Sequence, residues 1–348
     1  ALVLTGYGLK DAINDIVQNQ FQKVFRYDLL AGYSAEDEAE EQALFDQLES
    51  DPDIKEWMPQ YRAAITAVDE RHSYEVNLTV SQDYTRLTDF ISLQERVSRR
   101  VLTPEREGAI ITEKLGTMLG LKAGDTLTLR DGDNRTYELA IAGVSENYAS
   151  HFVYISAEYY EEVFGKAPEY NAVIVDLADR DDWAAASEKL LAGGTVQMIS
   201  SDAELVEQYK NVTDNLGYVV AVLIVSAGLL AFVVQYNLSN INITERTREI
   251  ATLKVLGFYD GEVSAYIYRE SVILTILGTG LGLLLGTALT RFVVATAEVD
   301  SIMFGRSIYW PSFLMAALIT FLFSFLVNWV MHYRLKKINM VESMKSVD

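Results

Sequence analysis

The chain has 348 residues, and its 49 acidic side chains against 29 basic ones give a formal net charge of −20 at pH 7. This charge argues against binding nucleic acid or an anionic lipid surface, because phosphates are repelled at long range. Cysteine is absent, which excludes disulfides and thiolate chemistry. The acidity is confined to residues 1–216, which carry 40 acidic and 19 basic side chains; ordinary solubility explains it.

The chain begins with Ala1-Leu2-Val3-Leu4-Thr5-Gly6, without an initiator Met. This apolar stretch is typical of the last turn of a membrane helix, so we expect another span to precede it. A processed mature terminus is the alternative.

Residues 1–201 alternate helix and strand and predict a mixed α+β domain. Apolar residues at helical spacing predict helices at 10–23, 35–49, 157–164 and 181–191. Runs rich in β-branched and aromatic residues predict strands at 62–67, 74–79, 90–93, 152–155, 172–175 and 196–199. The segment from Gly108 predicts a strand followed by a helix that Thr112 caps. Asp131-Gly-Asp-Asn134 predicts a hairpin between strands at 125–130 and 137–144.

From Asp202 the pattern becomes helical and continues without proline into an apolar run. Leu205, Val206, Tyr209, Val212 and Leu216 form one apolar stripe. We expect a helical stalk at 202–217. It either transmits movement or serves only as a linker, and helical continuity favours neither.

Three runs lack charged residues and histidine, at 215–244, 271–290 and 307–331. Each holds the ~20 apolar-rich residues that a helix needs to cross a bilayer. We predict transmembrane helices at 218–236, 271–295 and 308–332, a connector at 237–270, a loop at 296–307 and a tail at 333–348. The absence of intramembrane charge gives little support to an ion or proton path.

Basic residues near the span ends predict the orientation. The connector and tail together carry eight, and the opposite side carries three. By the positive-inside rule the connector and C-terminus are cytosolic, and the domain before the first span lies outside.

The connector segment Thr244–Gly257 predicts a short helix. Thr244 is the expected cap, Glu245 with Arg248 and Arg246 with Glu249 are pairs at three-residue spacing, and Gly257 ends the helix in left-handed geometry. The pattern alone indicates a solvated connector at the membrane surface.

The residues themselves carry a resemblance. Asn240-Ile-Asn-Ile-Thr-Glu-Arg-Thr-Arg-Glu-Ile-Ala-Thr-Leu-Lys-Val-Leu-Gly-Phe258 is similar to the cytosolic segment of FtsX-like/MacB-like permeases of ABC transporters. The likeness continues through Tyr268-Arg-Glu-Ser-Val-Ile-Leu274, the glycine-rich second span and the short basic tail. Leu4–Ile13 and Gly108–Tyr148 resemble the start and middle of the family's extracytoplasmic domain, so the resemblance covers most of the chain.

The resemblance implies a fold class and a location. The fold is an α+β extracytoplasmic domain of the MacB-like periplasmic core type, followed by a three-helix all-α transmembrane region. The location is the bacterial cytoplasmic membrane, crossed several times. In this family one span precedes the outer domain and three follow, which agrees with the span expected before Ala1.

The resemblance also implies a function, a permease subunit or C-terminal half that couples ATP hydrolysis in a partner to an outer domain by mechanotransmission. The outcome is export or extraction of lipid, lipoprotein or peptide, or control of a cell-wall process. The chain itself is not an enzyme, since ATP and Mg bind the partner. The implied ATPase-coupling residues are Glu245, Arg246, Arg248, Glu249, Leu253, Lys254, Gly257 and Phe258. The implied partners are a cytosolic ABC ATPase subunit, a second permease copy or N-terminal half, membrane lipid and an extracytoplasmic protein, without nucleic acid.

Two other functions remain open. One is a membrane-anchored extracytoplasmic receptor or adhesion protein without an ATPase, and the weaker one is an anchored hydrolase. No Gly-x-Ser-x-Gly motif supports the hydrolase.

The second span contains Gly278, Gly282 and Gly286 on one face, which permits close helix packing. Packing within one permease and packing across a dimer explain this pattern equally well.

Other motifs indicate nothing further. Gly165-Lys166 lacks the Ser or Thr of a phosphate loop, so the chain is not expected to be its own ATPase. His72, His151 and His332 lack ligand spacing, so no metal site is expected.

Overall fold

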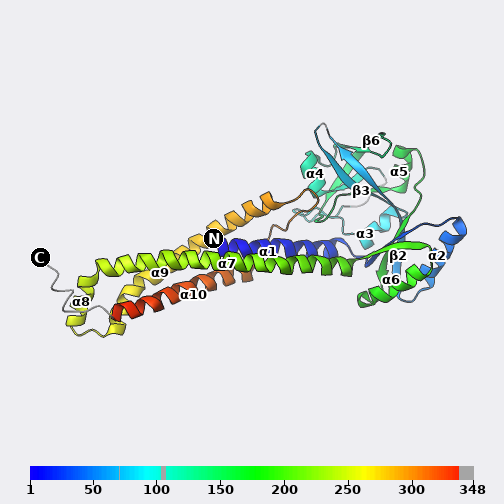
Figure 1. Cartoon of the computed structure of the whole chain (residues 1–348). Helices are drawn as coiled ribbons and strands as arrows, with labels where there is room; N and C mark the ends of the chain where they lie inside the picture. The colour runs from blue at the N-terminus through cyan, green and yellow to red at the C-terminus, as the bar shows by residue number, and fades with distance from the viewer. Residues whose placement is uncertain (70, 103–106, 337–348) are drawn as a thin grey trace. The chain divides into compact units, whose positions relative to one another are not determined.

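A computed structural model describes residues 1–69, 71–102 and 107–336. The chain forms two compact units. We call Ile13–Val212 together with Glu298–Gly305 the sheet domain, and we call Ala1–Ala12, Thr213–Ala297 and the residues from Arg306 onward the helical unit. Figure 1 shows both and labels their helices and several of the strands.

The sheet domain is built on strands that join into one nine-stranded sheet. The strands are β1 (Leu29–Tyr33), β2 (Ile54–Val68), β3 (Ser73–Ser81), β4 (Ala109–Thr112), β5 (Thr126–Arg130), β6 (Thr136–Ser145), β7 (Phe152–Ser156), β8 (Ala172–Leu177) and β9 (Val196–Ser201). Their order is β3-β7-β4-β6-β5-β2-β8-β1-β9, with β3 also pairing with β2.

The 15-residue strand β2 organises this sheet. Its first half pairs with β8, and its second half pairs with β3 and, at Thr66–Val68, with β5. Six strands therefore close into a ring, β2-β3-β7-β4-β6-β5, from which β8, β1 and β9 extend as an open sheet. A strand that pairs on both edges leaves no exposed edge at this position.

Each part has its own core. The ring encloses aliphatic side chains such as Val76, Leu127 and Ile155, closed by α4 (Glu113–Leu119) and α5 (Ala157–Phe164). The open sheet buries Val173 and Val175 against α2 (Glu38–Ser50) and α6 (Trp183–Ala192), which lie at the same end of the domain in Figure 1. The alternating burial of β1, β5 and β6 follows from the strand period of two, whereas β4 and β7 are buried throughout.

A third core joins segments that are distant in the chain. The first helix, α1 (Leu2–Asn19), continues into a π-helical turn, η1 (Gln20–Val24), and α3 (Leu87–Phe90) lies in the same cluster. The core includes Phe21, Val24, Phe25, Phe90, Leu93, Tyr148, Phe152 and Met303. Met303 comes from the segment Glu298–Gly305, so this segment is part of the sheet domain's interior.

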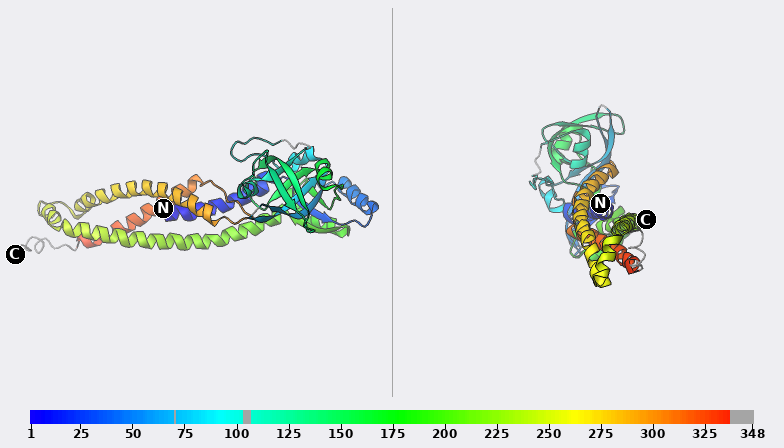
Figure 2. Two further views of the ribbon diagram at one scale, coloured as in Figure 1. Left: turned by 90° about the horizontal axis from the view of Figure 1, so that it is seen from above. Right: turned by 90° about the vertical axis from the view of Figure 1, so that its left-hand side faces the viewer.

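The helical unit is dominated by long helices, drawn from two directions in Figure 2. They are α7 (Asp202–Glu245), α8 (Thr247–Val255), α9 (Asp260–Ala297) and α10 (Trp310–Lys336). Among the described residues, three segments are long and apolar enough to cross a membrane, namely Gly217–Glu245, Arg269–Ala297 and Trp310–Met331. Many of their leucines and valines are exposed, as expected for helices whose solvent is lipid. Helix α7 covers the expected stalk at 202–217 without a break.

Most predicted elements of the sheet domain form, with corrections. The prediction of a strand at 90–93 is wrong, because Phe90 ends α3 and Ile91 makes only an isolated bridge to Phe25. The helix expected at 35–49 begins at Glu38, since Asp37 caps it by accepting from the amides of Ala39 and Glu40. Strand β1 was not predicted.

Thr112 occupies the N-cap position of α4 but makes no capping hydrogen bond with its side chain. Its hydroxyl instead accepts from the amide of Phe152 at 3.4 Å. Thr112 is fully buried, and its hydroxyl bonds to the neighbouring strand instead of capping the helix.

Candidate functional site

The predicted connector helix exists as α8, but it begins differently. Thr244 is an internal residue of α7, and its hydroxyl donates to the carbonyl of Asn240 at 2.8 Å. The prediction that Thr244 caps the connector helix is therefore wrong. Arg246 forms the short break between the helices, while the amide of Ile250 still donates to its carbonyl at 3.0 Å.

One face of α8 is anchored inside the helical unit. Ile250 and Ala251 are buried, and Ile250 clusters with Val263 of α9 and with Val327 and Met331 of α10. Leu253, a predicted coupling residue, packs against this same cluster. Leu253 is therefore partly buried and helps to hold α8 against α9 and α10.

The charged residues lie on the other side. Glu245, Arg248 and Glu249 are exposed. Arg246 does not pair with Glu249 as predicted, because its Nη2 lies 2.9 Å from Glu270 Oε2 on α9. This half-exposed ion pair links the break before α8 to the start of the second span. The side chain of Lys254, another predicted coupling residue, lies outside the described part of the structure.

The end of α8 is formed as the sequence predicts. Gly257 has φ of +94°, a left-handed conformation that residues with a Cβ rarely adopt. The amide of Phe258 donates to the carbonyl of Leu253 at 3.2 Å, which closes a Schellman motif around the glycine.

The turn after α8 presents four apolar side chains that sequence reasoning largely missed. Val255, Leu256, Phe258 and Tyr259 are 49% to 79% exposed, and we call them the apolar rim. Only Phe258 was predicted as a contact residue. The run Val-Leu-Gly-Phe-Tyr was the sequence signal for this surface. Apolar residues on both sides of a glycine that ends a helix do not all lie on the helix's buried face, so some of them are expected to be exposed. Contiguous exposed apolar residues mark interaction surfaces.

The glycines of the second span occupy different environments. A methyl group at Gly286 would lie 3.0 Å from Leu4 and 3.1 Å from Ala1, so α1 packs closely there. Gly282 is near Ala1, while nothing lies within 4 Å of the corresponding position at Gly278. Gly278 instead lines a cavity of about 280 Å³ with polar side chains around it.

A polar cluster joins the three long helices. Ser324 of α10 accepts from Gln235 of α7 at 2.8 Å and lies 2.9 Å from the hydroxyl of Thr275 on α9. Hydrogen bonds of this kind hold membrane helices together. This cluster was not predicted, because its residues are far apart in the sequence.

The motifs set aside earlier have structural roles. Gly165 ends α5 with φ of +73°, and the ring of His72 lies 3.4 Å from Asp69. Within residues 1–69, 71–102 and 107–336, no group of three or more acidic, histidine or cysteine side chains is arranged to hold a metal ion.

Comparison with known proteins places these features in a family. Residues 1–192 match the MacB-like periplasmic core domain, and residues 221–340 match the C-terminal region of FtsX-like permeases. The chain belongs to the FtsX-like/MacB-like family of ABC transporter permeases. The α+β domain followed by three apolar helices is the fold class expected for such a permease, and α8 with its apolar rim lies within the FtsX-like region.

Individual relatives are distant. The chain is 28% identical over 180 residues to an uncharacterized ABC transporter permease of Methanocaldococcus jannaschii, covering 50% of this chain and 44% of that protein. The chain thus spans less than half the length of this curated relative.

Two solved structures are similar at low identity. The periplasmic region of MacB from Actinobacillus actinomycetemcomitans aligns with 12% identity and a TM-score of 0.34, covering 54% of this chain and 94% of that one. The extracellular domain of the noncanonic ABC-type transporter YknZ from Gram-positive bacteria aligns with 16% identity and a TM-score of 0.33, covering 50% and 98%.

Proposed function

We propose that this permease couples ATP hydrolysis by a separate cytosolic ATPase to a conformational change of the sheet domain outside the membrane. Family membership supports an ATPase partner, which would supply the ATP and Mg sites. The chain is the non-catalytic half of this machine. Its cargo class is lipid, lipoprotein or peptide, or it controls a cell-wall process, with a second permease copy or an N-terminal half completing the transporter.

The observation that carries this proposal is the construction of α8. Its inner face is packed on α9 and α10 through Ile250, and Arg246 is paired to Glu270, so contacts link α8 to both helices. Its outer side combines exposed charges with the apolar rim. An exposed element that combines apolar and charged side chains has the composition of a protein interface.

The proposed ATPase contact consists of the apolar rim and the exposed charges, namely Glu245, Arg248, Glu249, Val255, Leu256, Phe258 and Tyr259. Lys254 remains a proposed contact on the basis of the resemblance. The excess of basic residues in the connector and tail supports a cytosolic position for this surface and an outer position for the sheet domain.

The test is affinity purification of the tagged full-length protein from its native membrane in mild detergent, with the retained proteins identified by mass spectrometry. We expect a nucleotide-binding subunit to be retained, and Leu256→Asp with Phe258→Ala to reduce its recovery at least about tenfold, as for hot-spot residues. Leu284→Ala is the matched control, because Leu284 is similarly exposed on α9.

Two results would contradict the proposal. Repeated absence of any ATPase from the unaltered protein would favour a receptor or adhesion function. Full retention of the ATPase by the rim variant would show that it binds elsewhere.

A further inference from the structure

The segment Glu298–Gly305, between α9 and α10 in the chain, belongs to the sheet domain and is attached to it by an isolated β-bridge. Ile302 forms an antiparallel bridge with Ala149. The amide of Met303 donates to the carbonyl of Tyr148 at 2.9 Å, and the amide of Ser150 donates to the carbonyl of Ser301 at 2.8 Å. These bonds attach the segment to the turn between β6 and β7.

Apolar burial strengthens the attachment. Met303 is 4% exposed within the third core, and Ile302 and Phe304 pack against the same core. Gly305 follows at a position where a methyl group would lie only 2.2 Å from the Cβ of Asp15. The segment therefore fits against α1 only with glycine at this position.

A largely buried ion pair joins the start of the segment to α4. Glu298 Oε2 lies 2.9 Å from Lys114 Nζ of α4, and these side chains are 7% and 15% exposed. Glu298 Oε1 also accepts from the amide of Phe304 at 3.1 Å, which folds the segment back on its own start. Loss of one member of such a pair leaves the other charge buried, which is strongly unfavourable.

The receiving turn is held rigidly from one side by η1. Gln20 is completely buried, and its Oε1 accepts from the amides of Tyr148 and Ala149 at 2.7 and 3.2 Å. Its Nε2 donates to Asn147 Oδ1 at 3.0 Å, and Asn147 in turn donates to the carbonyls of Ala149 and Ser150. π-helical turns frequently occur at functional positions.

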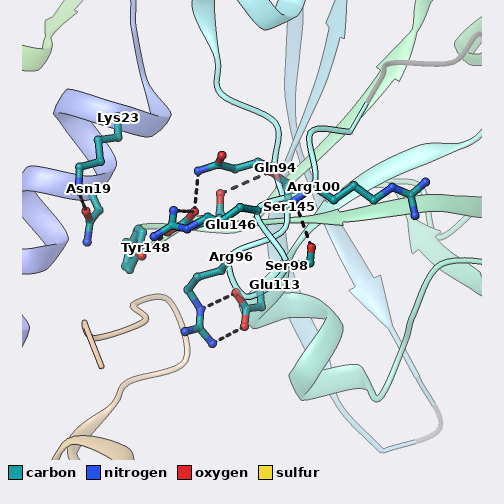
Figure 3. A network of polar contacts seen from close by, with 11 residues as sticks. Asn19, Lys23, Gln94, Arg96, Ser98, Arg100, Glu113, Ser145, Glu146 and Tyr148 are labelled. Carbon is teal, nitrogen blue, oxygen red and sulfur yellow. Dashed lines mark hydrogen bonds and ion pairs between the residues drawn. The ribbon is translucent and has the colours of Figure 1, made fainter. Parts of the chain in front are cut away.

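The other side of the turn is held by Glu146, at the centre of the network in Figure 3. This buried carboxylate accepts from Gln94, from Arg99 and from the hydroxyl of Tyr148. Burial raises the pKa of Tyr148 well above its usual range, and Glu146 raises it further, so the hydroxyl remains a donor. The turn is thus preorganised, and docking of the segment requires little further ordering.

We propose that Glu298–Gly305 is a coupling latch, through which displacement of α9 and α10 reaches β6 and β7. This inference rests on the proposed function and adds a connection separate from the stalk portion of α7. The latch transmits this displacement only while it is docked on the turn between β6 and β7. The Lys114–Glu298 ion pair stabilises the docked state. Lys114 and Glu298 are accordingly positioning residues.

The first test measures the latch without any partner. In the full-length protein in lipid nanodiscs, Lys114→Met should speed hydrogen exchange of the Ser150 and Met303 amides at least about tenfold, because exchange reports local opening. Lys55→Met is the matched control, since Lys55 also pairs with a carboxylate of the sheet domain, Asp176, at an exposed position. Unchanged exchange in Lys114→Met would overturn the latch.

The second test measures coupling in the complex with the co-purified ATPase. In the unaltered protein ATP should change hydrogen exchange of β6 and β7. Lys114→Met should reduce that change at least about twofold, and the double variant Lys114→Glu with Glu298→Lys should restore it, as expected for a charge pair. An intact ATP response in Lys114→Met would overturn the latch alone, whereas no response in the unaltered protein would overturn the proposed function and the latch with it.

A covalent lock distinguishes a docked latch from one that must open. The chain has no cysteine, so Ala149→Cys with Ile302→Cys introduces a single possible disulfide. Directly opposed residues in antiparallel pairs have Cα atoms about 4.5–5.5 Å apart, which suits a disulfide. We expect the oxidised protein to keep its ATP response; loss on oxidation and recovery on reduction would show that undocking is required and would overturn the proposal.

Discussion

At the scale of single residues, Asp202 is unusual, because it is a buried carboxyl group at the first position of α7. It is 7% exposed, and its Oδ2 has no hydrogen-bond partner among the described residues. Burial raises its pKa to about 8, Arg180 opposes the shift, and Asp28 adds to it. A pKa raised to this value favours the protonated, uncharged form of Asp202 at neutral pH.

This state predicts a pH dependence. A carboxyl group whose folded pKa is raised favours the folded state below its unfolded pKa, and this advantage is lost as pH rises through the folded value. The Asp202 contribution should thus fall by about 1.4 kcal/mol for each pH unit between about 4 and 8. Denaturant unfolding of the full chain, followed by tryptophan fluorescence, checks this.

Asp202→Asn should remove that slope, because asparagine has a similar shape and stays neutral. Glu188→Gln is the control, since Glu188 is exposed on the neighbouring helix α6. Equal pH slopes in Asp202→Asn and the unaltered protein would show that the carboxyl is ionised when folded.

Gly257 gives a second prediction at this scale. A side chain at φ of +94° is strained, so Gly257→Ala should destabilise the end of α8 by about 1–2 kcal/mol and displace the apolar rim. Recovery of the ATPase in the affinity purification should fall.

Gly261→Ala is the matched control for this change. Gly261 lies in helix α9 without a positive φ, and a methyl group there meets nothing within 4 Å. Equal recovery of the ATPase by both glycine variants would show that the left-handed geometry at Gly257 is not needed for ATPase binding.

At the scale of elements, the π-helical turn η1 connects α1 to the turn between β6 and β7 on which the latch docks. Its Gln20 satisfies two backbone amides and one side-chain amide of the turn before β7. A π turn inserts an extra residue into the helix, which lets Gln20 and Phe21 both lie inside the domain.

Replacement of Gln20 should therefore be costly. Gln20→Leu leaves buried polar groups without partners, at about 1–3 kcal/mol each, so we expect the sheet domain to lose several kcal/mol of stability. Denaturant unfolding measures this loss. Gln42→Leu serves as control because Gln42 is exposed on α2, and equal stability of the two variants would show that the network contributes nothing net.

At the scale of the whole molecule, the proposed topology separates the exposed surfaces into two compartments. The cysteine-free chain allows this to be tested with single cysteines and a membrane-impermeant maleimide on intact cells. Glu188→Cys in the sheet domain should be labelled, and Arg248→Cys on α8 should be labelled only after the cells are opened. The reverse pattern would invert the topology, and with it the side on which an ATPase binds.

The sequence by itself determined the class of molecule and most local elements. Uncharged apolar runs of about 20 residues indicate membrane-spanning helices, because this is the length that crosses a bilayer. The Asp131–Asn134 turn and Gly257 were predictable because their backbone geometry depends on neighbours in the chain. The family was predictable because the connector residues are contiguous.

Only the tertiary structure decided what depends on residues far apart in the chain. The ring closed by β2, the pairing of Arg246 with Glu270 and the polar cluster at Ser324 all join distant segments. The loop after the second span was expected only as a connection, yet it supplies Met303 to a core and Glu298 to a shielded ion pair. Burial and pairing of this kind arise from the packing of whole elements, which no local pattern encodes.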